Sequence, residues 1–247
     1  MMMPFSRFAF LLIALYWGLT PIAYSQVINT DYGNNRLQYE QKKWFRYTSE
    51  NFMITYAEND EELARYALPV LELDYIELSR LFEHQLKKKV VVVIHSDFSD
   101  YIQSNMGFHR HQVNQGGITQ IVTPKMEVYF NGDHQNLRHQ IRRGMAEVLL
   151  GKVLSGTSLQ EIVQNSVLMN LPTWFVQGAI AHATEGWNTT LDDRLRDVLL
   201  TGKYENFVEF AKKEPFLAGH SLFHYIAQDH SASTVSNLLY LTRINRS

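Results

Sequence analysis

The sequence predicts an α+β fold, in which a small mixed sheet with its helices comes before an all-helical half. Two observations carry this prediction. Short runs of β-branched and aromatic residues, typical of strands, lie before residue 131. After residue 135, apolar residues recur at helical spacing and no convincing strand pattern follows. The chain of 247 residues, 45% of them hydrophobic and 19% charged, is long enough for one large domain or two small ones.

The first 25 residues have the features of a secretory signal peptide. Arg7 is their only charge, and 8–19 is an apolar run interrupted only by Gly18. Twelve helical residues span about 18 Å, less than the ~30 Å of a bilayer core. Ala23-Tyr24-Ser25 supplies a small-residue cleavage pattern. We therefore expect an exported protein, periplasmic or further out, with no membrane span in the mature chain; an uncleaved anchor is the alternative.

Composition excludes several classes of function. The chain has no cysteine, which excludes disulfide scaffolds, cysteine-ligated zinc and thiol catalysis. The net charge of −2, without a basic region, argues against a nucleic-acid partner. The sequence also contains neither a GxSxG elbow nor a GxGxxG loop.

The elements are expected in the following order. Residues 26–45 form a polar arm with one short strand, and 46–134 form the α/β part. Within that part the patterns predict strands and two helices, the longer one with Pro69 inside it, where it kinks or divides. The strands are 52–56, 89–95, 118–122 and 126–130, and the helices are 60–86 and 97–106.

The all-helical half is expected to cover 135–247. Its helices are 136–154, 159–167, 173–183, 191–200, 207–213, 220–229 and 233–245. The last helix has an apolar face and no capping glycine, which predicts further chain after Ser247.

Two segments of this half stand out. The first is LRHQIRRGMAEVLL at 137–150, where helical spacing puts His139, Gln140, Arg143 and Glu147 on one polar face. The second is LPTWFVQGAIAH at 171–182, where a proline near the helix start is favourable.

These segments together resemble the gluzincin zinc peptidases, in particular the peptidase-MA-like domain. The segments 31–39 and 51–56, with Trp44, are similar to the start of exported bacterial TolB-type proteins, in which such a domain precedes a WD40-like β-propeller. The resemblance covers about 31–243 and implies a zincin-like fold. That family holds zinc with His-Glu-x-x-His on one helix and a glutamate on a second.

Carried over position by position, the resemblance implies a degenerate site. His139 keeps the first ligand position, but Gln140 replaces the general base and an amide takes no proton at neutral pH. Arg143 replaces the second histidine, and Gln177 replaces the third ligand. An arginine is a permanent cation and does not bind Zn²⁺. His182 stands where the family often has tyrosine, and Trp174 and Gly178 are kept as structural residues.

We therefore expect a catalytically inactive metallopeptidase-like domain without a cofactor, which binds or supports an envelope protein or a following β-propeller. Arg143 is expected to fill part of the metal's space and to keep a nearby carboxylate ionised. The alternative is a zinc peptidase with a shifted site at His220 and His224, four residues apart on one helix, or at His182. His109 and His111 form another histidine pair, and Arg142 with Arg143 suggests an acidic ligand. The oligomeric state stays open.

Overall fold

The computed structural model describes residues 42–103, 125–155 and 171–244. These belong to one unit of the chain, Tyr39–Ser247. The expected signal peptide, most of the expected arm, strand 118–122, helix 159–167 and the pair His109 and His111 lie outside the described residues.

A four-stranded mixed sheet has the order β1-β2-β3-β4. Strand β1 (Trp44–Thr48) pairs antiparallel with β2 (Phe52–Ala57), which pairs parallel with β3 (Val90–His95), and β3 pairs parallel with β4 (Lys125–Tyr129). The α+β prediction is confirmed. β1 begins inside the segment expected to be the arm. The sequence does not mark the bounds of this strand, because its side chains are mostly exposed and its residues lack the alternation that marked β2.

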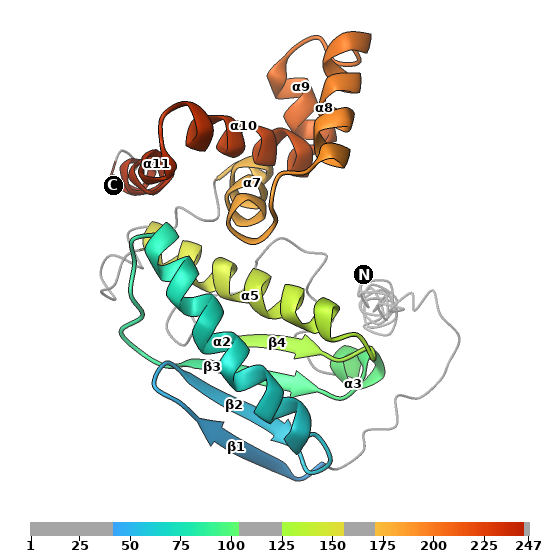
Figure 1. Cartoon of the computed structure of the whole chain (residues 1–247), viewed down its shortest axis with the longest axis vertical. Coiled ribbons are helices and arrows are strands. Elements are labelled where there is room, and N and C mark those ends of the chain that lie inside the picture. The colour runs from blue at the N-terminus through green and yellow to red at the C-terminus, as the bar shows by residue number, and fades with distance from the viewer. Residues whose placement is uncertain (1–41, 104–124, 156–170, 245–247) are drawn as a thin grey trace, which may run out of the picture. The chain divides into compact units, whose positions relative to one another are not determined.

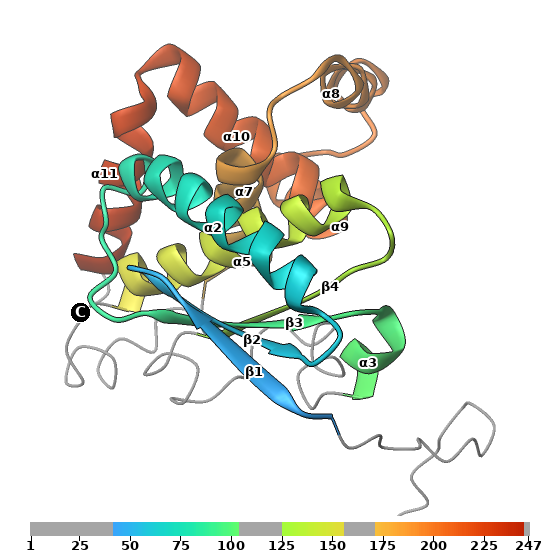
Figure 2. The same cartoon turned by 60° about the horizontal axis from the view of Figure 1, so that its bottom comes forward.

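One face of the sheet carries the core. Two long helices, α2 (Glu61–Leu81) and α5 (His134–Ser155), lie over that face (Figures 1 and 2). The register of the strands turns every second side chain toward them. The largest fully buried side chains are Phe52, Ile54, Leu71, Leu78, Ile94, Leu137, Ile141, Met145, Leu149, Leu150, Leu154 and Phe223. Helix α2 continues through Pro69 and ends earlier than expected.

The helical half is confirmed in its described part. After the short α3 (Phe98–Gln103) in the sheet region, the remaining helices are α7 (Thr173–Thr184), α8 (Thr189–Thr201), α9 (Phe207–Lys213), α10 (Pro215–Asp229) and α11 (Ala232–Ile244). Helix α10 starts five residues before the expected 220, because Pro215 suits the first helical turn. None of the helices among the described residues is long and apolar enough to cross a membrane.

Candidate functional site

The polar residues of α5 meet a carboxylate at the end of α7. Glu185 caps the C-terminus of α7, and one of its oxygens, Oε1, lies 3.7 Å from His139 Nε2 and 3.8 Å from Arg143 Nη1. Arg143 Nε also lies 3.4 Å from Glu147, one turn further along α5. The guanidinium therefore lies between two carboxylates, and its side chain is one-third exposed. We call His139, Arg143, Glu147 and Glu185 the α5 cluster.

Gln140 departs from the polar face on which it was expected. It is only 8% exposed and turns toward the sheet, where its Oε1 accepts a hydrogen bond from the Tyr129 backbone N–H (3.2 Å). Its Nε2 donates to the Tyr129 carbonyl (3.0 Å) and to Asn136 (2.5 Å). Gln140 neighbours the buried Ile141 on the helix, so its amide packs under β4 and satisfies a backbone group there.

Gln177 is half-buried in the middle of α7. Among the described residues, no hydrogen bond or ion pair joins it to His139 or Arg143. Glu185, two turns further along the same helix, is the α7-side residue that contacts them. The gluzincin resemblance did not point to Glu185, because the motif that carries it on this helix is WFVQG and ends before Glu185. The one available signal was a carboxylate eight residues after Gln177, which helical spacing places near the same side.

The neighbouring arginine, Arg142, belongs to a second network that ties three helices together. Its Nη1 donates to Asp74 (3.1 Å) and Glu77 (2.7 Å) of α2, and its Nη2 donates to the Ala183 carbonyl of α7 (3.2 Å). Asp74 is only 1% exposed. Because these contacts use the guanidinium of Arg142 internally, an acidic ligand would have to compete with Asp74 and Glu77 for it.

Two histidines of α10 pack against one indole beside the α5 cluster, and a third histidine, on α7, packs against Phe223. His182 lies on α7, and His220 and His224 lie one turn apart on α10. The Trp187 ring stacks on His224 (4.8 Å between centroids, 9° between planes) and meets His220 edge-on (5.2 Å, 86°). Phe216 meets His220 edge-on, and Phe223 stacks on His182. We call His182, His220, His224 and Trp187 the histidine cluster.

Burial favours the neutral form of two of these histidines, His220 and His182. His220 is 1% exposed, and burial, together with His182 and His224, lowers its pKa to about 4, although a hydrogen bond to the Glu185 backbone works in the opposite direction. Burial, with a smaller effect from His224, also lowers the pKa of His182. Desolvation disfavours the charged imidazole, so both rings stay neutral at neutral pH.

The described residues contain no group of three or more histidine, aspartate or glutamate side chains placed to hold a metal ion. The expected pair His220 and His224 does come together on α10, but the Trp187 ring lies against both imidazoles. The geometry of the pair is therefore that of an aromatic cluster.

A second buried histidine lies on the sheet and was missed by the sequence patterns. His95 ends β3, and its Nε2 lies 3.4 Å from Glu127 of β4, which also pairs with Lys125 (2.7 Å). The parallel register of β3 and β4 brings the two side chains together. No local signal predicts this pair, because it depends on which strands are neighbours.

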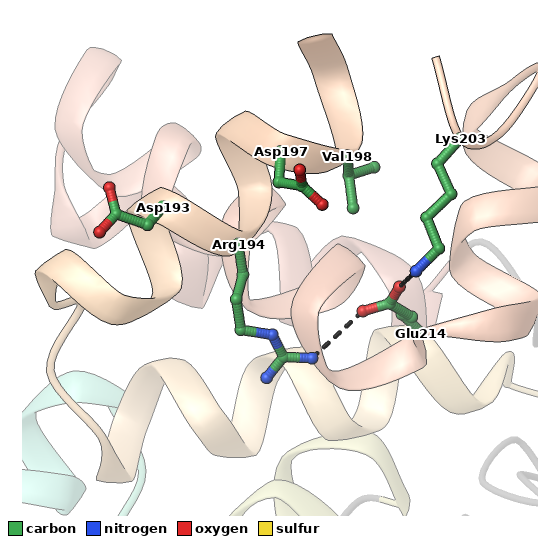
Figure 3. Close-up of a pocket in the computed structure, with 6 residues that line it drawn as sticks. All are labelled: Asp193, Arg194, Asp197, Val198, Lys203 and Glu214. Carbon is green, nitrogen blue, oxygen red and sulfur yellow. Dashed lines mark hydrogen bonds and ion pairs between the residues drawn. The ribbon is translucent and has the colours of Figure 1, made fainter. Parts of the chain in front are cut away.

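A cavity of about 390 Å³ lies in the lobe formed by α8 and the helices that follow it (Figure 3). Two basic side chains of the lining form ion pairs with the Glu214 carboxylate, Arg194 at 3.2 Å and Lys203 at 2.8 Å. Tyr204 donates a third hydrogen bond to the same carboxylate (2.7 Å). None of the site residues expected from the sequence lines this cavity; its lining is Asp193, Arg194, Asp197, Val198, Lys203 and Glu214.

The chain was also compared with known proteins. No protein family, no curated protein and no solved structure matches it.

Proposed function

We propose that this chain is an exported, catalytically inactive domain of zincin-like fold, which serves as a binding or structural module in the bacterial cell envelope. The single observation that supports it best is the pairing of Arg143 with Glu185 beside His139. These residues include two of the positions at which the resemblance expects zinc ligands.

The charges of the α5 cluster favour this reading. A metal site needs neutral histidines and carboxylates around a vacant position. Here a permanent cation, Arg143, lies between the carboxylates of Glu147 and Glu185. The cluster therefore pairs its carboxylates with an arginine side chain in place of a metal ion.

The position of the general base supports the same conclusion. A base must reach the proton that it removes and must be able to hold it. The Gln140 amide has no basic oxygen at neutral pH, and both of its ends are engaged by Tyr129 and Asn136. Activation of a water by this residue is chemically unsupported.

The domain is proposed to bind another envelope protein or a β-propeller that follows it in the same polypeptide. This part of the proposal rests on the resemblance of 31–39 and 51–56 to TolB-type proteins. Function resides in sites grafted on a fold, so a scaffold without its metal remains available for binding.

Measuring bound zinc tests the proposal directly. The purified full chain, loaded with zinc and dialysed, is expected to retain far less than one equivalent, and Arg143→His alone is expected to restore neither zinc nor peptidase activity. The reason is that the base and the third ligand are still missing. One equivalent of zinc that His139→Ala removes would overturn the proposal.

The alternative, a shifted zinc site, predicts different zinc binding and cleavage in the variants. It predicts chelator-sensitive cleavage in a peptide library and loss of zinc in His224→Gln, while His139→Ala keeps both. His230→Gln is the matched control, because this histidine is exposed at the end of α10 and contacts only Asp229 among the ion pairs of the described part.

A further inference from the structure

We propose that the histidine cluster is a pH-operated latch, which holds α10 against the end of α7 at neutral pH and releases it on acidification. The latch is independent of the proposed function, since it depends only on how α7, α10 and the segment at Glu185–Trp187 meet. Its centre is His220, the buried histidine of α10.

The neutral state is well packed. The His220 ring hydrogen-bonds to the backbone of Glu185, while its Nδ1 is buried without a hydrogen-bond partner among the described residues. Trp187 and Phe216 cover the ring edge-on at 5.2 and 5.7 Å. A neutral imidazole tolerates one bare nitrogen in such a place, because that nitrogen carries no proton.

Protonation changes this balance. A proton on Nδ1 becomes a buried donor without an acceptor, on a ring that now carries a full charge. The groups that act on that charge are His182 of α7, His224 of α10 and the Glu185 backbone. None of these is a carboxylate, and the two imidazoles repel the new charge whenever they are protonated.

His224 adds to the repulsion. It is only partly buried and stacks on the face of Trp187, a position in which an indole attracts a cation. His220, which lies one turn away on the same helix, has no such face-on contact, because Trp187 meets its ring edge-on. The depressed pKa values of His220 and His182 agree with this arrangement.

Glu185 connects the latch to the α5 cluster. Its backbone contacts His220, and its carboxylate pairs with His139 and Arg143. When α10 moves away from Glu185, the residue that pairs with Arg143 loses its contact with His220. Acidification is therefore transmitted from the α7–α10 contact to the polar face of α5.

Hydrogen exchange on the full chain tests the latch. At about pH 5 compared with pH 7, after correction for intrinsic exchange rates, amides of 215–229 and 185–188 are expected to open on the order of tenfold more often. Amides of β2 and β3 are expected to keep their protection. Uniform acceleration across the chain, or none, would overturn the proposal.

Two variants assign the effect to His220. His220→Gln retains a donor but cannot titrate, so the tenfold difference is expected to disappear. His230→Gln, at the exposed end of the same helix, is expected to keep it. If His220→Gln fails to fold, an NMR titration of the wild-type ring decides: protonation well below pH 6.5 supports the latch, and protonation at 6.5 or above overturns it.

Discussion

Gly178 of α7 and Gly219 of α10 face each other where the two helices cross. A Cβ added to Gly178 would lie 2.4 Å from the Gly219 carbonyl carbon, and one added to Gly219 would lie 2.0 Å from the Trp174 carbonyl oxygen. Atoms that are not bonded do not approach so closely, so the backbones leave no space for a side chain. This approach brings Glu185 and the histidine cluster to the same end of α7.

Gly219→Ala is expected to destabilise the protein by about 3 kcal/mol, because the clash is with backbone and relief requires the two helices to separate. This cost outweighs the gain of up to about 1 kcal/mol that alanine gives inside a helix. Urea unfolding followed by circular dichroism measures the change.

Gly186→Ala is the matched control for this substitution. Gly186 is exposed, and an added Cβ would meet nothing within 4 Å. Its effect is expected to stay within about 0.5 kcal/mol. Equal stability of the two variants would show that the α7–α10 crossing is not close-packed.

Asp74→Ala is expected to cost about 3 kcal/mol, because it removes the buried carboxylate that Arg142 contacts and leaves that guanidinium partly uncompensated. Glu77 contacts the same guanidinium at 2.7 Å but is 63% exposed. Glu77→Ala is expected to cost less than about 1 kcal/mol. A cost in Glu77→Ala as large as in Asp74→Ala, measured by thermal unfolding, would refute the assigned role of burial.

The sequence patterns predicted the elements whose side chains have one buried face. Strand β3 and helices α5, α7 and α9 begin within two residues of the expected positions. The spacing of apolar residues in the local sequence follows which side chains are buried, so it predicts such elements. One short strand was expected in the arm 26–45, but its bounds were not predicted and β1 runs on to Thr48, because Phe45 and Trp44 are nearly half exposed and pairing with β2 defines the strand.

The candidate site was predictable only in part. Helical spacing put Arg143 and Glu147 together, and they do pair. It also put Gln140 on that face, which was wrong. The residue lies at the edge of the buried stripe, and its amide hydrogen-bonds to Tyr129 of β4 instead. Trp187 joins the histidine cluster through the packing of α10 beside α7, which no local period reveals, whereas Glu185 lies at helical spacing from Gln177.

The unfolding free energy is expected to fall as the pH drops from about 6.5 toward 4. The unfolded chain binds a proton on His220 once the pH passes its ordinary pKa of 6.5, whereas the native ring stays neutral until about 4. Between pH 7 and 5 the wild type should lose about 2 kcal/mol more than His220→Phe, as measured by urea unfolding at both pH values. Equal losses in the two proteins would contradict the burial of a neutral His220.

Gln140→Glu would restore the general-base position of the gluzincin pattern, and we expect it to destabilise the protein at pH 7 by about 2 kcal/mol. A carboxylate would face the Tyr129 carbonyl and the Asn136 oxygen, which now accept hydrogen bonds from the Gln140 amide. Burial and these acceptors favour the protonated acid, so the loss should shrink as the pH falls below about 5. Gln135→Glu makes the same change at an exposed position in the first turn of α5, where a negative charge is favourable, and is expected to be neutral or slightly stabilising. Chemical unfolding of both variants across pH separates the outcomes: a Gln140→Glu protein as stable as Gln135→Glu at pH 7 would mean that the amide of Gln140 contributes nothing to the contact with β4.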